Sequence, residues 1–408
     1  MNGREAMPLL NELHAELVSE LSSIINYWEK YSVDQIHGGF IGQIDENENR
    51  HEESPKGSVL NARILWSLSA AYNLSPDPEK LKLAERSFDY ISTNFVDKAY
   101  GGVYWTLDAL GKPLDTKKQI YAIAFTIYGL SEYYKASQNL AALDLAVSLF
   151  KEIEEHSFDG DKGGYLEALT REWTEITDLR LSDKDANEKK TMNTHLHVLE
   201  AYTCLYSVWR DAQLLKKLKE LIYVFRHHII GENGHLKLFF DENWEVKTTQ
   251  ISYGHDIEAS WLLLEAALVA GDAELIEDIK EIAVQIAEAS LAGLSDDGGM
   301  NYEYDPVKKH LDADKHWWVQ AEAMVGFFNA WELSGSQHYL DACYKTWQFI
   351  NQYIIDQQHG EWIWGVHADH TKIVGEDKVG LWKCPYHNSR ACVELINRIT
   401  AIDKKQRS

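Results

Sequence analysis

The chain has 408 residues, of which 45% are hydrophobic and 25% charged, a composition typical of folded globular proteins and not of disordered ones. Its formal net charge of −24 argues against binding to nucleic acid or to anionic membranes, which are themselves negatively charged. The 14 Trp and 21 Tyr residues offer flat apolar faces with polar edges, which suit sugars, although a tryptophan-rich core would also explain them.

The sequence shows no signal for export, membrane insertion or disulfide formation. Charged residues interrupt the first ten positions, and no window holds 18 uncharged apolar residues. The cysteines include no C-x-x-C pair, so we expect reduced thiols in the cytoplasm rather than a zinc knuckle or a disulfide framework. They are Cys204, Cys343, Cys384 and Cys392.

A short glycine-led motif, which contains an aromatic or apolar residue, recurs six times along the chain. Its copies are 63, 62, 71, 64 and 62 residues apart, counted between their first glycines, and such regular spacing indicates an internal repeat. Each copy opens a stretch that alternates apolar and polar residues, which predicts a short β-hairpin. The copies begin at Gly38, Gly101, Gly163, Gly234, Gly298 and Gly360.

Two kinds of helix alternate along the chain between these motifs. The first kind has one charged face, as outer helices should, and is predicted at 8–31, 79–96, 139–156, 211–230, 272–290 and 337–355. The second kind is rich in Ala, Leu and aromatic residues on all sides, as buried inner helices should be. It is predicted at 57–74, 117–136, 190–209, 253–270, 316–333 and 385–401.

Six repeats of outer helix, hairpin and inner helix predict an all-α fold, an (α/α)6 barrel of six inner and six outer helices with short β-hairpins at one mouth. A closed ring is favoured over an open solenoid because neither end shows a polar capping repeat. No linker rich in Pro, Gly or Ser interrupts the chain, so we expect one domain spanning 1–408. The hairpins and the N-terminal ends of the inner helices should meet at one mouth and form the pocket.

The third inner helix begins with an asparagine and two histidines. Asn193 and His197 are four residues apart on one helical face, whereas His195 points roughly to the opposite side. Because a helix separates the two histidines and no third ligand accompanies them, a metal site is not favoured. A structural hydrogen-bonding role is the better interpretation of His195.

The fourth and sixth inner helices also begin with histidines. His255 and Glu258 share a face, so the carboxylate can hold the imidazole for general acid–base catalysis, although a helix-start carboxylate beside a filler histidine is the alternative. Pro385, at the predicted first helical position, places His387 in the first turn. The helix dipole there favours a neutral imidazole that can accept a proton, although helix capping would explain this histidine as well.

Aromatic residues and one arginine lie near the same helix starts. Trp318 begins the fifth inner helix and Trp382 precedes the sixth, and one or two such rings should stack on a sugar. Arg63, in the first inner helix, can bind an oxyanion or form a salt bridge. Glycine-rich nucleotide motifs, G-x-S-x-G and H-E-x-x-H are absent, which argues against nucleotide-binding enzymes, esterases and zinc proteases.

Four ordered motifs resemble those of the N-acylglucosamine 2-epimerase family, and in particular its bacterial cellobiose 2-epimerase branch. They are Met-Asn-Thr-His-Leu-His at 192–197, Ser-Tyr-Gly-His-Asp-Ile-Glu-Ala-Ser-Trp at 252–261, His-Trp-Trp-Val-Gln-Ala-Glu-Ala at 316–323 and Trp-Lys-Cys-Pro-Tyr-His-Asn at 382–388. The likeness covers essentially the whole chain. It implies an (α/α)6 barrel that converts the reducing-end glucose of cellobiose, lactose or related oligosaccharides to mannose, without a metal or any other cofactor.

The resemblance also implies roles for individual residues. His255 and His387 match the acid–base pair, and His197 matches a histidine that assists ring opening or polarises the sugar carbonyl. Positions that contact the substrate or support a histidine are matched by Arg63, Tyr121, Asp185, Asn193, Glu258, Trp318 and Trp382.

This chemistry agrees with the residues themselves. Inversion at C2 of an aldose requires ring opening, removal of a proton made acidic by the C1 carbonyl, and return of a proton from the other face, so two bases are needed. Imidazoles suit both roles because they titrate near neutrality. The hypothesis is that Arg63, His197 and the N-terminal ends of inner helices stabilise the enediolate intermediate.

Three other functions remain open on the sequence alone. They are an aldose–ketose isomerase of the mannose isomerase type, a glycoside hydrolase, which needs two carboxylates in place of paired histidines, and a carbohydrate-binding module without catalysis. For the epimerase interpretation we expect a small disaccharide as substrate, no nucleic-acid or membrane partner, and a monomer or weak homodimer.

Overall fold

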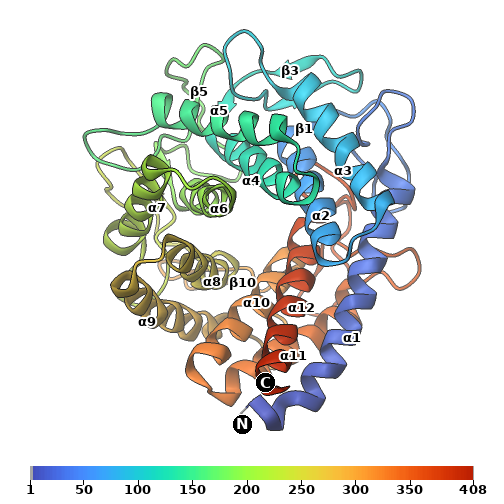
Figure 1. The fold of residues 1–408 in the computed structure, drawn as a ribbon. Coiled ribbons are helices and arrows are strands. Elements are labelled where there is room, and N and C mark those ends of the chain that lie inside the picture. Colours follow the sequence, from blue (N-terminus) through green and yellow to red (C-terminus); the bar gives the residue numbers. More distant parts are fainter. Residues whose placement is uncertain (1–2, 408) are drawn as a thin grey trace.

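The computed structural model describes residues 3–407, so the predicted domain 1–408 extends beyond it by residues 1–2 and 408. Within this range twelve α-helices alternate between an outer and an inner layer (Figure 1). The outer helices are α1 (Gly3–Tyr27), α3 (Pro78–Tyr90), α5 (Leu140–His156), α7 (Ala212–Val224), α9 (Ala273–Ser290) and α11 (Gln337–Phe349). The inner helices are α2 (Ser58–Leu74), α4 (Ile120–Ser137), α6 (Met192–Val208), α8 (Tyr253–Ala270), α10 (Trp317–Ser334) and α12 (Tyr386–Arg407).

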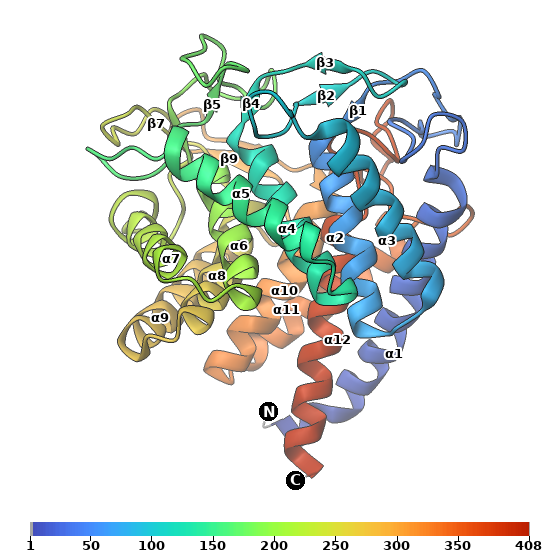
Figure 2. The same ribbon diagram turned by 45° about the horizontal axis from the view of Figure 1, so that its top comes forward.

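The inner helices form a closed ring. Each contacts its neighbours in the order α2, α4, α6, α8, α10, α12 and back to α2. The first outer helix, α1, packs against the last inner helix, α12, so the two ends of the chain complete the last repeat together (Figure 2). The predicted (α/α)6 barrel is therefore confirmed.

Close packing explains the composition of the inner helices. Because they are covered on nearly all sides, most of their side chains are buried, and small residues occur where two helices approach. A Cβ atom on Gly129 of α4 would lie 2.6 Å from the carbonyl oxygen of Ala62 on α2. A Cβ on Gly326 of α10 would lie 2.5 Å from the side chain of Ile257 on α8. No helix within residues 3–407 combines the length and the apolar character needed to cross a bilayer.

Short strands gather at one mouth of the ring, at the top of Figure 2. Two antiparallel pairs, β9–β10 and β2–β3, are hairpins, and the register of β2–β3 shifts between Thr106 and Leu107. The other strand pairs join neighbouring repeats. The strands are β1 (Lys56–Gly57), β2 (Thr106–Leu107), β3 (Pro113–Asp115), β4 (Lys118–Gln119), β5 (Ala168–Leu169), β6 (Lys190–Thr191), β7 (Phe239–Phe240), β8 (Ile251–Ser252), β9 (Glu303–Asp305), β10 (His310–Asp312), β11 (Lys315–His316) and β12 (Gly365–Val366).

Most outer helices end in a single irregular turn that leads into the glycine-led motif. The turns are η1 (Trp28–Ser32), η2 (Ile91–Phe95), η3 (Phe225–Ile229), η4 (Leu291–Gly293) and η5 (Ile350–Ile354). One residue after each outer-helix end then pairs with the motif through a single bridge, such as Val33 with Phe40 and Ile355 with Trp362. The repeated motif therefore marks the return of the chain from the outer to the inner layer.

An ion pair fastens four of these returns to the strand or loop that precedes an inner helix. In the first repeat, the Lys56 ammonium donates to Asp34 at 2.6 Å and to the carbonyl of Gly38 at 2.7 Å. Gly38 has a positive φ of 80°, a conformation that glycine adopts without strain. The same lysine–aspartate–glycine pattern occurs at Lys118, Asp97 and Gly101, at Lys190, Asp159 and Gly163, and at Lys378, Asp356 and Gly360.

Candidate active site

The N-terminal ends of the inner helices lie at the mouth that carries the strands, and each of the six helices contributes a residue predicted for the site. Five of them begin directly after a strand, which fixes where the first helical turn lies. The residues are Arg63 on α2, Tyr121 on α4, Asn193 and His197 on α6, His255 and Glu258 on α8, Trp318 on α10 and His387 on α12.

His255 and His387 both lie against the indole of Trp318. The ring centroids of Trp318 and His255 are 4.8 Å apart, and those of Trp318 and His387 are 5.7 Å apart. The two imidazoles therefore share one neighbour and belong to one site, although 132 positions separate them in the sequence.

A different group holds each of these histidines through its Nδ1 atom. The Nδ1–H of His387 donates to Glu322 of α10 at 2.6 Å, so a buried carboxylate orients this ring. Nδ1 of His255 forms a hydrogen bond of 2.8 Å with the hydroxyl of Ser252. Among the described residues none forms a hydrogen bond with the Nε2 atom of either histidine, which leaves Nε2 available for proton transfer.

The predicted pairing of His255 with Glu258 is wrong. The Glu258 carboxylate instead accepts a hydrogen bond of 2.5 Å from Arg390 of α12. Residues three apart on a helix share a face only approximately. The nearby guanidinium attracts the carboxylate of Glu258 more strongly than a neutral imidazole can.

His197 lies on α6, the inner helix next to α8. Its Nδ1–H donates to Glu200 at 2.9 Å, and its ring packs against Tyr121 and Phe125, with centroid distances of 5.0 and 4.6 Å. The Tyr121 hydroxyl accepts a hydrogen bond of 2.7 Å from Arg63. Arg63, Tyr121 and His197 thus form one connected wall of the site.

Arg390 is the electrostatic centre of the site, and no sequence pattern predicted this role. Its guanidinium donates to Glu322 at 2.6 Å and to Glu258, and it also binds Glu200 and the hydroxyl of Tyr386. The side chain is only 1% exposed, so these charge-assisted hydrogen bonds lie in a dry, low-dielectric environment. Arg390 therefore links Glu322, which binds His387, to Glu200, which binds His197.

Burial sets the protonation states of the site. It lowers the pKa of His255 to about 3, with a further contribution from His197, and it also lowers the pKa of His197 and His387. Burial and the neighbouring Glu322 raise the pKa of Glu258 to about 8. In the free site, burial therefore favours the neutral form of all three imidazoles, which can accept a proton.

Two groups of acidic and histidine side chains are close enough to share a cation, but each already contains a protein cation. The ligand atoms of Glu258, Glu322 and His387 lie within 4.8 Å of one another, and Arg390 donates to both carboxylates. The second group is Glu48, Asp356 and His359, where Lys378 binds both carboxylates.

The remaining predicted residues lie around this centre. Trp382, half-buried before α12, contacts Tyr121 and Trp105 with centroid distances of 6.0 and 5.8 Å. The side-chain oxygen of Asn193 is buried without a hydrogen-bond partner among the described residues. Asp185 belongs to the loop between β5 and β6, where it accepts hydrogen bonds from Ser182, and the structure shows no contact with the three histidines in the described range.

The structural interpretation of His195 is confirmed. Its Nε2 accepts a hydrogen bond of 2.9 Å from the backbone N–H of Tyr165, and its Nδ1–H donates to the carbonyl of Thr191 at 2.6 Å. The Nε2 atom thus joins α6 to the third glycine-led motif, and the Nδ1–H binds the N-cap residue of α6 itself.

Three supporting residues were not singled out from the sequence, although a signal exists for two of them. Glu200 follows His197 by three residues and Glu322 follows Trp318 by four, so each lies one helical turn from a site residue. Arg390 follows His387 by three residues, but its acidic partners lie on three other helices.

Comparisons with known proteins agree with this geometry. The family description N-acylglucosamine 2-epimerase (GlcNAc 2-epimerase) matches residues 38–391. The chain is 52% identical over 386 residues to a cellobiose 2-epimerase of Bacteroides fragilis, covering 94% of this chain and 98% of the relative.

A solved structure of cellobiose 2-epimerase from Spirochaeta thermophila superposes with a TM-score of 0.92 at 36% identity, covering 97% of this chain and 99% of that one. A D-mannose isomerase of Marinomonas mediterranea is more distant, at 20% identity over 89% of this chain and 92% of the relative.

Proposed function

The chain belongs to the N-acylglucosamine 2-epimerase family, and we propose that it is a cofactor-independent carbohydrate epimerase acting on cellobiose and related β-1,4-linked disaccharides such as lactose. The reaction converts the reducing-end glucose to mannose by inverting C2. Two observations support this proposal. The chain is 52% identical to a cellobiose 2-epimerase over nearly its whole length, and paired histidines lie at the barrel mouth. We further propose that the whole chain, 1–408, is one catalytic domain.

The observation that carries the proposal is that His255 and His387 lie against the same indole with both Nε2 atoms free. One histidine enters as the neutral base and removes the C2 proton of the opened sugar, leaving an enediolate. The other enters as an imidazolium, and its Nε2–H returns a proton to the opposite face. Each histidine ends the turnover in the other's starting protonation state, so the roles exchange in the reverse reaction.

The second wall of the site supplies charge stabilisation. In this proposal Arg63 and His197 face the sugar's C1–C2 region. The Nε2 atom of His197 accepts the anomeric hydroxyl proton when the ring opens, and the imidazolium so formed and the Arg63 cation then stabilise the negative oxygens of the enediolate. The N-terminal ends of the inner helices add positive partial charge at the same mouth. Each such donor is worth about 3 kcal/mol in a water-excluded site.

The carboxylates have a positioning role in this mechanism. Glu322 and Glu200 each bind an Nδ1–H, which fixes the tautomer that directs Nε2 toward the substrate. Arg390 holds both side chains in place through its hydrogen bonds, and its charge helps to lower the pKa of Glu200 to about 2. We assign substrate contacts to Trp318 and Trp382 as sugar-stacking rings, and to Glu258, Asn193 and Asp185 as partners of hydroxyl groups.

Two alternatives are less well supported. An aldose–ketose isomerase would use the same scaffold, and the relatives named D-mannose isomerase are only distantly similar. A glycoside hydrolase needs two carboxyl groups facing the glycosidic bond, but Glu258 and Glu322 are bound by Arg390 instead.

Incubation with cellobiose, followed by chromatographic separation of the products, tests the proposal. We expect a disaccharide whose reducing sugar is mannose as the dominant product. A dominant keto-disaccharide would support the isomerase instead, and release of free glucose would support a hydrolase.

A further inference from the structure

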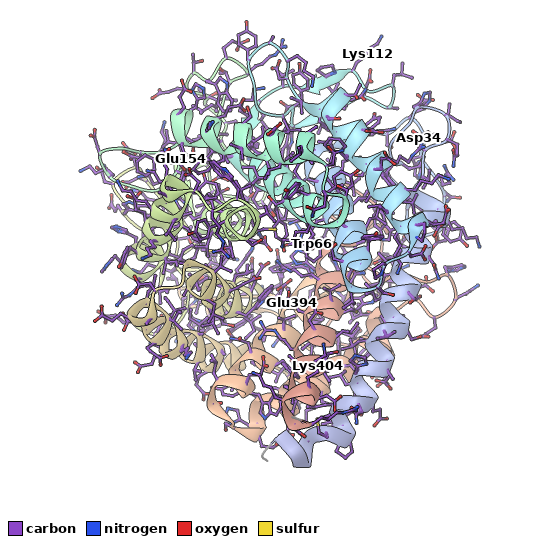
Figure 3. All side chains as sticks on the ribbon, viewed as in Figure 1. Asp34, Trp66, Lys112, Glu154, Glu394 and Lys404 are labelled. Carbon is purple, nitrogen blue, oxygen red and sulfur yellow. The ribbon has the colours of Figure 1, made fainter. Side chains whose placement is uncertain are left out.

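The barrel has a cavity at the mouth opposite to the histidines. It has a volume of about 440 Å³ and lies between the C-terminal halves of α8, α10 and α12. In Figure 3, Glu394 of this cavity lies close to the centre of the ring of helices. The lining polar residues are Glu265, Asn329, Glu332, Glu394, Asn397 and Arg398.

The cavity carries more negative than positive charge. Arg398 donates to Glu332 at 2.7 Å and to Glu394 at 3.4 Å, so one cation serves two carboxylates. The half-buried Glu265 carboxylate has no hydrogen bond or ion pair within the described part of the chain. Burial and the nearby Glu394 raise the pKa of Glu265 to about 7, while the positive charges of Lys135 and Arg398 act in the opposite direction. The C-terminal ends of α8 and α10 add negative partial charge.

An unused hydrogen-bond donor lies in the same cavity. Asn329 is only 1% exposed, and its side-chain oxygen accepts a hydrogen bond of 3.1 Å from Arg398. Because an arginine can only donate, this bond fixes the orientation of the amide, and the NH2 group is left without a partner among the described residues. A buried donor in this situation favours a ligand that brings an oxygen acceptor.

These features fit an organic cation better than a metal ion. Metal coordination needs several ligand atoms close together, and neither of the two such groups among residues 3–407 includes a residue of this cavity. The cavity also has an apolar side formed by Leu264, Leu268 and Leu333, which suits carbon atoms.

We propose that this cavity is a second binding site, distinct from the histidine mouth, for a small polyhydroxylated amine. Its ammonium group binds Glu265 and Glu394, and one of its hydroxyl oxygens accepts a hydrogen bond from the NH2 group of Asn329. Binding of the amine at this site does not depend on the proposed epimerase activity.

Calorimetric titration of the full chain with serinol tests the site, with glycerol as the matched probe that replaces the amine by a hydroxyl group. We expect serinol to bind with one-to-one stoichiometry and at least about tenfold more tightly than glycerol, because only the amine can pair with Glu265. Serinol binding no tighter than glycerol, or a tighter complex with Mg²⁺ alone, would overturn the proposal.

Three variants locate the site. Glu265→Gln keeps the shape but removes the charge, and it should weaken serinol binding at least about tenfold. Leu268→Arg places a cation at the cavity from a position that is 53% exposed, so it should block binding without disturbing the core. Glu274→Gln, on the exposed surface of α9, is the control and should bind like the wild type. Unchanged binding by both cavity variants contradicts the assignment.

Discussion

Each of the three site histidines has one ring nitrogen bound to the protein and one without a hydrogen bond to any residue in the range 3–407. The committed atom is Nδ1 in every case, bound to Glu322, Glu200 or Ser252. Neutral imidazole carries a single N–H, so a partner that accepts at Nδ1 leaves Nε2 as the basic atom. The carboxylate partners favour an imidazolium more than a serine hydroxyl does, which makes the two acid–base histidines chemically unequal.

Replacing Glu322 by Gln tests the positioning role of this carboxylate. The amide still accepts a hydrogen bond from His387, but it no longer compensates the charge of an imidazolium or of Arg390. We expect kcat for cellobiose epimerisation to fall by about 10- to 100-fold with little change in KM.

Glu281→Gln on the exposed face of α9 provides the control for that experiment and should leave both constants unchanged. A rise in KM alone for Glu322→Gln would show that the residue acts in substrate binding instead.

Residue-level prediction succeeded where the partner lies within one helical turn or where the motif is distinctive. His195 and His197 were separated correctly because helical geometry alone places them on different sides. Prediction failed for Glu258, which is paired with the wrong residue, and for Arg390, which is not identified. The acidic partners of Arg390 lie 190, 132 and 68 positions away from it in the sequence. Spacing along a helix contains no information about contacts of that range.

At the level of the elements, hydrophobic patterning identified all twelve helices in the described range, because inner and outer helices differ in how many faces are buried. The strands were harder to predict. Most are two residues long and pair with a neighbouring repeat, so their pairing depends on ring closure and not on local sequence. The buried lysines before the inner helices were also overlooked, since a charged residue ordinarily indicates a surface position.

Substitution of Lys56 by Met tests whether the buried ion pairs hold the glycine-led motifs in place. Removal of the ammonium leaves the Asp34 carboxylate, 1% exposed, without its cation. We expect the free energy of unfolding, measured with urea, to fall by about 3–5 kcal/mol.

Lys82→Met, at a lysine whose side chain is 75% exposed, is the matched control and should change stability by less than about 0.5 kcal/mol. A comparable loss in both variants would mean that the pair at Lys56 contributes no more than a surface lysine.

His195→Gln tests the structural role of this residue through pH. Burial lowers the pKa of His195 to about 4 in the folded chain, from 6.5 for an ordinary histidine. Between these values the unfolded chain takes up a proton that the folded chain does not, so wild-type stability falls as the pH is lowered.

The Gln variant has no imidazole at this position, so its free energy of unfolding lacks this pH-dependent loss. The difference in free energy of unfolding between the wild type and the variant should therefore narrow by about 3 kcal/mol between pH 7 and pH 4. Urea titrations at several pH values measure the difference in free energy of unfolding between the two proteins. The contributions of the other histidines are the same in both and cancel in this difference. A difference independent of pH would show that His195 is not held neutral in the folded chain.

On the scale of the whole molecule, the barrel is electrically polar. The N-terminal ends of all six inner helices point toward the mouth with the histidines, and their C-terminal ends toward the other mouth. Positive partial charge at the first mouth suits an enediolate, and negative partial charge at the second suits a cation. The sixfold repeat, detectable from glycine spacing alone, therefore determines both the fold and the location of the site.

Deuterium exchange at C2 tests the two-histidine mechanism most directly. The enzyme is incubated with cellobiose in D2O, and both the substrate and the product are analysed by NMR, for the wild type, His255→Asn and His387→Asn. His338→Asn, at an exposed histidine of α11, is the control.

For the wild type and the control, we predict deuterium at C2 of the mannose-containing product. Each site variant should fail to form that product, yet should still exchange the C2 proton of one epimer, one variant exchanging the glucose form and the other the mannose form. A product that keeps the original C2 proton, or epimerisation by either site variant at the wild-type rate, would contradict the account.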